Sequence, residues 1–210
     1  MTATDTARDR ALVKRLVAAF PSADVAPGAP LLERLAERAE REGLLDVAVR
    51  TIDSPFGALL LAASRAGLVR VAFAREGHAA VLAQLAAEIS PRILQAPHRL
   101  DDAARQLDEY FARRRRRFEL RLDLQLAHGF RRAVLMRLQR LAYGETASYA
   151  RIARAAGKPA AVRAVGSACA HNPLPLVVPC HRVVRSDGTP GEYLGGRAAK
   201  QALLALEAAA

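Results

Sequence analysis

The chain has 210 residues, 51% hydrophobic and 25% charged, which is the composition of a folded protein of one or two domains. Its 32 Lys and Arg against 21 Asp and Glu give a formal net charge of +11. This surplus favours a polyanionic partner such as nucleic acid over an acidic small molecule. No run of about 18 apolar residues is free of charges, and the first residues lack a secretory signal pattern. We therefore expect a cytoplasmic protein with no membrane partner.

Sequence patterns divide the chain into residues 1–46, 47–125 and 126–210. These parts carry 7, 13 and 12 basic residues and 8, 9 and 4 acidic residues. The positive charge is thus concentrated in the last part, where we expect a polyanion to bind. Helices are predicted over 7–19 and 31–43. We interpret the first part as a helical extension for packing or solubility rather than recognition.

Residues 47–125 are predicted to form three strands, two helices and a final strand. The strands are expected at 47–52, 58–63, 68–73 and 118–124. Five consecutive arginines, 113–117, precede the last of them. We favour a solvated turn for this basic run over a phosphate contact. This part contains no metal-ligand or acid–base spacing and is interpreted as a scaffold.

The last part is predicted to begin with a helix from Phe130 to about Tyr143. A shorter helix follows, capped by Thr146 or Ser148 and running to about Ala156.

A second short helix is predicted after a tight turn, because Gly157 breaks the first helix and Pro159 suits the first turn of the next. This helix ends before Asn172, and the pair is typical of a helix-turn-helix. Arg163 is its only long polar side chain. Its other residues are mostly small: Ala160, Ala161, Ala164, Gly166, Ser167, Ala168 and Ala170. A helix this thin suits either close approach to DNA or tight core packing, and the surrounding positive charge favours DNA.

The two cysteines, Cys169 and Cys180, do not suggest a disulfide scaffold. Cys169, between alanines in a predicted helix, is expected in the core. Cys180 is a candidate nucleophile, since a neighbouring base or positive charge is needed to activate a thiol, and His181 and Arg182 follow directly. We expect them to lower the pKa of the Cys180 thiol. Glu207, the only carboxylate of the last predicted helix, is the candidate to orient His181.

A zinc site is the weaker alternative, because adjacent Cys and His do not match structural zinc spacings. Its ligands would be Cys169, His171, Cys180 and His181. We expect neither a metal nor a cofactor.

The segment from Ser148 to Glu207 resembles the O6-alkylguanine-DNA alkyltransferases, also called methylated-DNA–protein-cysteine methyltransferases. It carries RAVG, NP, PCHRV and GEYLGG in order, followed by a Lys and a Glu at matching spacing. The resemblance extends over about residues 47–210 and includes the LDEYF and FELRL segments. It implies an α+β protein with a ribonuclease H-like domain over 47–125. A mainly helical, winged-helix-like DNA-binding domain is implied for 126–210.

The resemblance implies a chemical role for four residues. Cys180 would accept the alkyl group in a single irreversible turnover. His181 would reach it through a water molecule and be oriented by Glu207. Asn172 would hold the turn between the recognition helix and the active-site segment.

The resemblance also implies a pocket for the flipped base. Tyr149 would press on the 3′ phosphate and donate a hydrogen bond to the base. Tyr193 and Leu194 would wall the pocket, with the Leu194 amide facing O6. The carbonyls of Cys180 and Val183 would accept from the guanine amine, and Lys200 would support the loop.

On the DNA side, Arg163 would enter the duplex through the minor groove and fill the gap left by the extruded nucleotide. Ala164, Gly166 and Ser167 would be the neighbouring DNA contacts. The implied partner is double-stranded DNA with alkylated guanine and also alkylated thymine. A monomer is expected, with cooperation between copies on DNA left open.

The chain departs from the family pattern at two places. AHGFRR replaces a frequent GTxFQ, so Arg131 and Arg132 stand beside Phe130. Leu194 stands where some members have Ser, which removes a side-chain hydroxyl contact. Two alternatives remain: a non-catalytic alkyl-lesion binder of the alkyltransferase-like type, disfavoured by Cys180, and a helix-turn-helix regulator, disfavoured by the lack of an effector domain.

Overall fold

The computed structural model describes residues 29–208, so the helix predicted over 7–19 lies outside the described residues. The chain divides into two compact units, Met1–Leu35 and Ala36–Ala210. Helix α2, Ala29–Arg41, provides the described residues of the first unit and continues into the second. Within the second unit, its buried positions contribute to a small apolar cluster: Ala36, Ala39, Leu45, Ala48 and Ala96.

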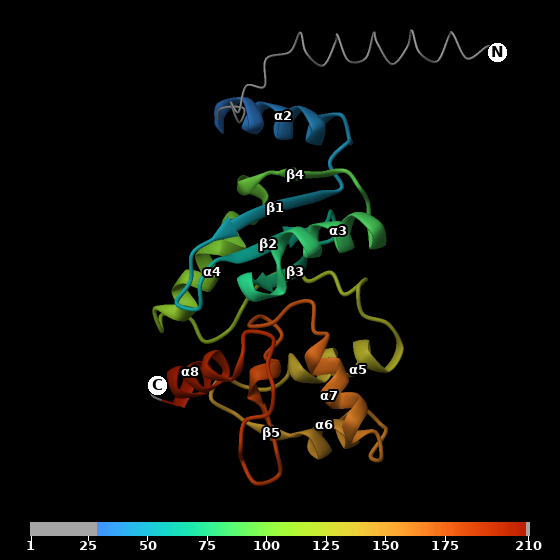
Figure 1. Cartoon of the computed structure of the whole chain (residues 1–210), viewed down its shortest axis with the longest axis vertical. Helices are drawn as coiled ribbons and strands as arrows, with labels where there is room; N and C mark the ends of the chain where they lie inside the picture. Colours follow the sequence, from blue (N-terminus) through green and yellow to red (C-terminus); the bar gives the residue numbers. More distant parts are fainter. Residues whose placement is uncertain (1–28, 209–210) are drawn as a thin grey trace, which may run out of the picture. The chain divides into compact units, whose positions relative to one another are not determined.

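A four-stranded sheet follows α2 in the chain (Figure 1). Its strands are β1 Val47–Ile52, β2 Leu59–Ala63, β3 Leu68–Phe73 and β4 Ile93–Gln95. The order is β3-β2-β1-β4, with antiparallel pairing among the first three strands and parallel pairing of β1 with β4. The short β4 was not predicted, because three residues carry too little period-two signal.

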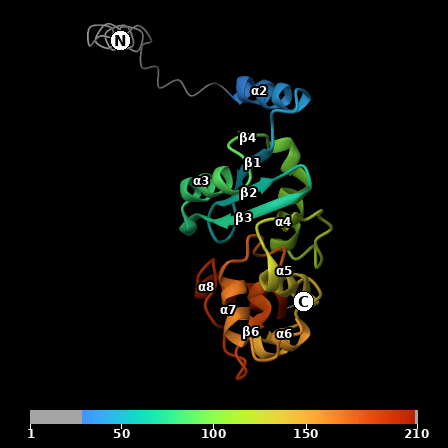
Figure 2. The same ribbon diagram turned by 90° about the vertical axis from the view of Figure 1, so that its right-hand side faces the viewer.

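Helices α3, His78–Glu88, and α4, Asp101–Phe111, lie on opposite faces of this sheet (Figure 2). Short 3-10 turns precede them, η1 Ala74–Glu76 and η2 Pro97–Leu100. Every residue of β2 is buried, with Leu60 and Ala62 in the cluster on the α3 side and Leu59, Leu61 and Ala63 in the larger cluster that includes α4. Since both faces are covered, the strand is a continuous apolar run.

The strand predicted over 118–124 is wrong. This segment pairs with the sheet only at one isolated bridge, Leu68 with Leu122, through hydrogen bonds from Leu68 N to Arg121 O and from Asp123 N to Leu68 O, each 2.8 Å. Its alternating apolar residues are partly buried against the main core. They are Phe118, Leu120, Leu122 and Leu124. The period-two pattern therefore arises because one side of an extended segment packs on the core, and it does not indicate a strand of the sheet.

The remaining residues form the predicted mainly helical part. Its elements are α5 Gly129–Leu138, β5 Ala147–Ser148, α6 Tyr149–Ala155, α7 Val162–Ala170, η3 Cys180–Arg182, β6 Val183–Val184 and α8 Arg197–Ala208. Two predicted boundaries are wrong. Helix α5 stops at Leu138 rather than near Tyr143, and α7 starts at Val162 rather than Pro159, because Ala161 N donates to Lys158 O in a turn.

Helices α6 and α7 form the predicted helix-turn-helix. Ser148 caps α6, its Oγ accepting from Arg151 N at 3.1 Å. Gly157 ends it with a φ of 79°, in the left-handed region that glycine adopts without strain. The predicted α+β class, a sheet domain followed by a helix-turn-helix domain, is confirmed. No helix within residues 29–208 has the length and apolar character needed to cross a bilayer.

Candidate active site and DNA-binding helix

Cys180 lies at the start of η3, 2% exposed. Asn172 lies two residues after the end of α7, the second helix of the helix-turn-helix. Its Nδ2 donates to Cys180 Sγ at 3.1 Å and to Val178 O at 2.8 Å. The Asn172 Oδ1 accepts from Leu174 N at 3.0 Å. One buried amide therefore holds the turn and touches the thiol, so any substrate must reach a nearly enclosed sulfur.

His181 and Glu207 form a buried pair beside the thiol. His181 Nε2 lies 2.9 Å from Glu207 Oε1, and both side chains are almost fully buried. An ionised carboxylate only accepts, so Nε2 carries the proton in this pair. The other ring nitrogen, Nδ1, is buried and has no hydrogen-bond partner among the described residues. A neutral His181 thus keeps one free acceptor.

Glu207 accepts four further hydrogen bonds, from three residues. Arg182 donates from Nε to Oε2 and from a terminal nitrogen to Oε1, each at 2.8 Å. Tyr110 Oη, from α4, donates to Oε1 at 2.7 Å. Gly144 N donates to Oε2 at 3.1 Å. The carboxylate that orients His181 is therefore fixed by residues from both domains.

Burial and these hydrogen bonds set the charge states. Burial would raise the pKa of Glu207, but the hydrogen bonds from His181 and Arg182 outweigh it and hold that pKa well below its usual range. Burial lowers the pKa of His181, against the opposing pull of Glu207. At neutral pH the site thus contains a carboxylate, a guanidinium and a neutral imidazole.

The expected lowering of the Cys180 pKa is wrong for the resting site. Burial raises the pKa of this thiol to about 11, although the hydrogen bond from Asn172 and the charge of Lys200 act in the opposite direction. His181 does not offset the burial because it is neutral and points its proton at Glu207. The thiol therefore has to lose its proton during the reaction rather than before it.

The scaffold domain also supports the active-site turn through β3 and η1. Arg70 donates to Asn172 O at 3.4 Å and pairs with Glu76 at 2.6 Å. Val71 N donates to Pro173 O at 2.8 Å.

Phe73 of β3 packs edge-on against Tyr193, with ring centroids 5.6 Å apart. Tyr193 is 8% exposed, and its hydroxyl has no partner among the described residues. Its ring lies 6.2 Å from that of His181, so the predicted pocket wall is next to the histidine. Leu194 is partly buried in the same loop.

Two further predicted site residues come from other helices, Tyr149 from α6 and Lys200 from α8. A Cβ on Gly191 would lie 2.5 Å from the Tyr149 hydroxyl, so only glycine leaves room there for that side chain. Lys200 is 1% exposed and donates to Val183 O at 2.5 Å. This carbonyl, implied as an acceptor for the guanine amine, is thus already hydrogen-bonded, with its second lone pair still available.

Helix α7 presents one face outward. Arg163, Ala164 and Ser167 are exposed, whereas Gly166 is partly buried near Tyr149. Cys169 is on the opposite face, buried in the main core as predicted. Only Arg163 can extend from this helix into a groove.

Three contributors to the site were missed from sequence. They are Tyr110, Gly144 and Arg70, which lie 97, 63 and 102 residues from the groups they contact. The LDEYF segment that contains Tyr110 was part of the resemblance, but its link to Glu207 has no local signal. Within residues 29–208, no cluster of three or more His, Cys, Asp or Glu could hold a metal ion.

We expect Tyr110→Phe to lower the free energy of unfolding by about 2 kcal/mol, because it removes a buried hydrogen bond to a charged group. Tyr143→Phe is the control, since the one hydrogen bond of the Tyr143 hydroxyl to a described residue is to the neutral carbonyl Leu206 O, at 3.3 Å. Urea unfolding would measure both. Equal losses for the two variants would contradict a special role for the Tyr110 contact.

The chain therefore combines a sheet domain, a helix-turn-helix and a buried cysteine followed directly by the histidine of a His–Glu pair. Residues 47–124 match the ribonuclease-like domain of 6-O-methylguanine DNA methyltransferase, and residues 129–209 match its DNA binding domain. A methylated-DNA–protein-cysteine methyltransferase of Mycolicibacterium paratuberculosis is 40% identical over 158 residues, covering 75% of this chain and 90% of the relative.

Solved structures agree. The O6-methylguanine methyltransferase of Mycobacterium tuberculosis is 37% identical with a TM-score of 0.68, covering 78% of this chain and 93% of that one. Mycobacterium tuberculosis OGT in complex with DNA is 37% identical with a TM-score of 0.67, covering 77% and 93%. The chain belongs to the methylated-DNA–protein-cysteine methyltransferase family.

Proposed function

We propose that this protein repairs DNA by moving the alkyl group of O6-alkylguanine, and also of O4-alkylthymine, onto Cys180. The observation that carries the proposal is the buried thiol held by Asn172 next to the His181–Glu207 pair. Membership of the family supports it. The substrate is double-stranded DNA and the site of action is the cytoplasm, where each monomer acts once without a cofactor.

In the transfer, Sγ attacks the alkyl carbon in line with the bond to O6. The new bond is carbon–sulfur, and the carbon–oxygen bond breaks with its electrons left on the guanine. The thiol proton passes through water to His181 Nδ1, the free acceptor. The negative charge of Glu207 stabilises the resulting His181 imidazolium. The guanine anion that leaves takes up one proton from solvent and becomes neutral guanine, and the imidazolium later returns its proton to solvent. The thioether does not hydrolyse, so the protein is consumed.

The base must leave the stack to reach a thiol that is only 2% exposed. We propose that α7 approaches the minor groove, with its small residues close to the backbone and Arg163 filling the gap. Tyr149 would contact the 3′ phosphate and the flipped base. Tyr193 and the Leu194 amide would line its pocket, with Lys200 holding the loop through Val183.

The direct test is to incubate the protein with a duplex containing O6-methylguanine and locate the added mass by peptide mapping. One methyl group on Cys180 is expected. An unmodified protein on a bound, still-methylated duplex would instead indicate a non-catalytic lesion binder.

The transfer rate should be flat from about pH 7 to pH 9. His181 has a lowered pKa and is already neutral in this range, while the Cys180 thiol, with a pKa of about 11, is still protonated. The rate should fall only in more acidic solution, where His181 takes up a proton. Single-turnover rates on a free O6-alkylguanine base would measure this. A rate rising about tenfold per pH unit would show that preformed thiolate, not the histidine, limits transfer.

Arg163→Ala should slow repair of duplex DNA far more than transfer from the free base, because only the duplex requires a residue to fill the gap. Arg154→Ala removes the same charge from an exposed position at the end of α6 and is the control. Rates on both substrates would be compared for the two variants. Equal losses on duplex and free base would contradict the gap-filling role.

A further inference from the structure

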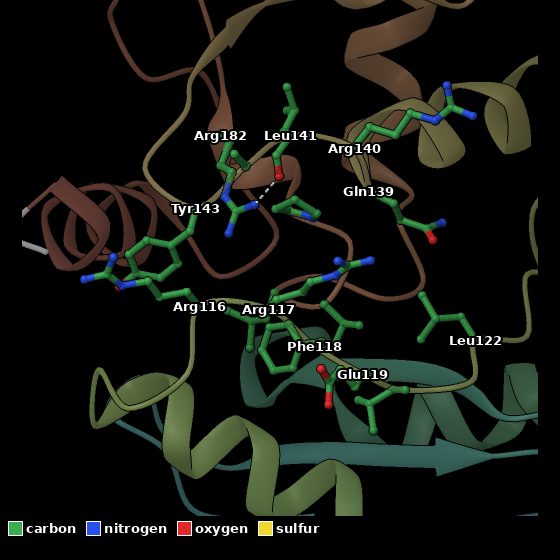
Figure 3. A pocket seen from close by; sticks show the side chains of 15 residues that line it. Arg116, Arg117, Phe118, Glu119, Leu122, Gln139, Arg140, Leu141, Tyr143 and Arg182 are labelled. Atoms are coloured by element: carbon green, nitrogen blue, oxygen red, sulfur yellow. Dashed lines mark hydrogen bonds between the residues drawn. The ribbon is translucent and has the colours of Figure 1, made fainter.

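A large groove lies between the segment after α4 and the segment after α5, and Pro179 and Arg182, on either side of the Cys180–His181 pair in the chain, also line it (Figure 3). Its volume is about 1000 Å³. No residue of α6 or α7 lines it, so this surface is distinct from the recognition helix. Among its lining residues, the proposed repair reaction involves Arg182 alone, through the hydrogen bonds from Arg182 to Glu207.

The five consecutive arginines, 113–117, differ in whether they form ion pairs and whether they line the groove. Arg114 and Arg115 pair with carboxylates of α4, at 3.8 Å from Asp108 and 2.8 Å from Glu109. Arg116 and Arg117 are exposed, line the groove and form no ion pair with any residue in the described range 29–208. The predicted solvated turn therefore describes Arg113 to Arg115, which do not line the groove, and not Arg116 and Arg117, which line it with no ion-pair partner among the described residues.

The rest of the lining combines positive charge with an apolar base. Arg140 also lines the groove and forms no ion pair with another described residue. Tyr143 lies under the guanidinium groups of Arg116 and Arg182, at 5.9 and 5.8 Å. The one acidic lining residue, Glu119, is exposed, 3.8 Å from Arg115. Apolar side chains make up most of the remainder: Phe118, Leu120, Leu122, Leu141, Leu176, Val177 and Pro179.

We propose that this groove binds a single strand of DNA, as a second nucleic-acid site. Free arginines at the rim suit the phosphates, and the apolar and aromatic base suits unstacked nucleobases, the combination used by single-strand-binding surfaces. A duplex keeps its bases stacked inside and would leave the apolar base unused.

The test uses the full chain saturated with a short unlabelled duplex that occupies α7. A fluorescein-labelled single strand of about 12 thymidines is then added, within the usual site size for such surfaces, and anisotropy is recorded over a salt series. The variants are Arg116→Gln with Arg117→Gln, and as control Arg113→Gln with Arg114→Gln, which removes the same charge from the same run outside the groove.

We expect the strand to bind the saturated complex. The groove variant should weaken this binding about tenfold or more and reduce the log–log salt slope by about 1.4, for two phosphates of a single strand. The control should change affinity less than about twofold, because its arginines do not line the groove.

Three results would overturn the proposal: no binding of the strand to the saturated complex, equal weakening by both double variants, or equal competition by inorganic polyphosphate. Methyl transfer to Cys180 from the free base is measured for every variant and shows that each one folds. Because transfer and strand binding are separate readouts, failure of this proposal is distinguishable from failure of the repair function.

Discussion

A Cys180→Ser variant should transfer no detectable alkyl group while binding duplex DNA with nearly unchanged affinity. Serine differs from cysteine by one atom, but its hydroxyl is a far weaker nucleophile, and neutral His181 is too weak a base to ionise it at a useful rate. The surrounding contacts are little affected, since Asn172 can donate to an oxygen as it does to sulfur. Mass spectrometry and a filter-binding or anisotropy titration would check the two halves of this expectation.

Cys169→Ser is the matched control. Cys169 is buried in the core, and burial raises the pKa of its thiol well above the ordinary value, so we expect methyl transfer to survive its replacement. Transfer that disappears with Cys169 and persists without Cys180 would refute the assignment of the acceptor.

Glu207→Gln should lower the free energy of unfolding by about 3–5 kcal/mol and abolish most of the transfer. The change leaves the guanidinium of Arg182, which is only 6% exposed, without its carboxylate partner. A buried charge with no compensating charge destabilises the folded state. The amide also presents donors where His181, Tyr110 and Gly144 already donate. Urea unfolding and single-turnover transfer would measure the two effects.

The pH dependence of stability offers a second measurement. The Glu207 pKa is lowered in the folded protein, so its contribution is present above the ordinary pKa of about 4.3 and is lost as the pH falls toward the folded value. The variant should lose this dependence. Glu192→Gln, at an exposed position of the same domain, should change neither stability nor transfer. A loss below about 1 kcal/mol for Glu207→Gln would show that the buried network is not needed for folding.

The strands β1 to β3 and the helices α3 and α4 were predictable because their apolar periodicity is local and continuous. The predictions were wrong where a local sequence pattern is typical of one element but the folded chain forms another. Residues 118–124 alternate like a strand because one side packs on the core, but they extend past the sheet and meet it at a single bridge. Pro159 suits a helix start, yet the chain first completes a turn, and α7 begins at Val162.

The site shows the same division. The candidate nucleophile, its histidine and carboxylate, and the helix-turn-helix could all be predicted from the sequence, because their motifs lie at fixed spacings between Ser148 and Glu207. The protonation states of Cys180 and His181 could not be predicted, because they depend on how deeply folding buries these side chains. Burial, which no local pattern encodes, raises the pKa of Cys180 and keeps His181 neutral.

The location of the positive charge could likewise be predicted only in part from the sequence. Counting placed most of it in the last domain, and the outward face of α7 carries Arg163 there. Counting could not distinguish the five consecutive arginines from one another. Folding does so, because Asp108 and Glu109 of α4 pair with Arg114 and Arg115, whereas Arg116 and Arg117 line the groove with no ion-pair partner between residues 29 and 208. Partners distant in the chain, rather than the run itself, determine which charges remain available.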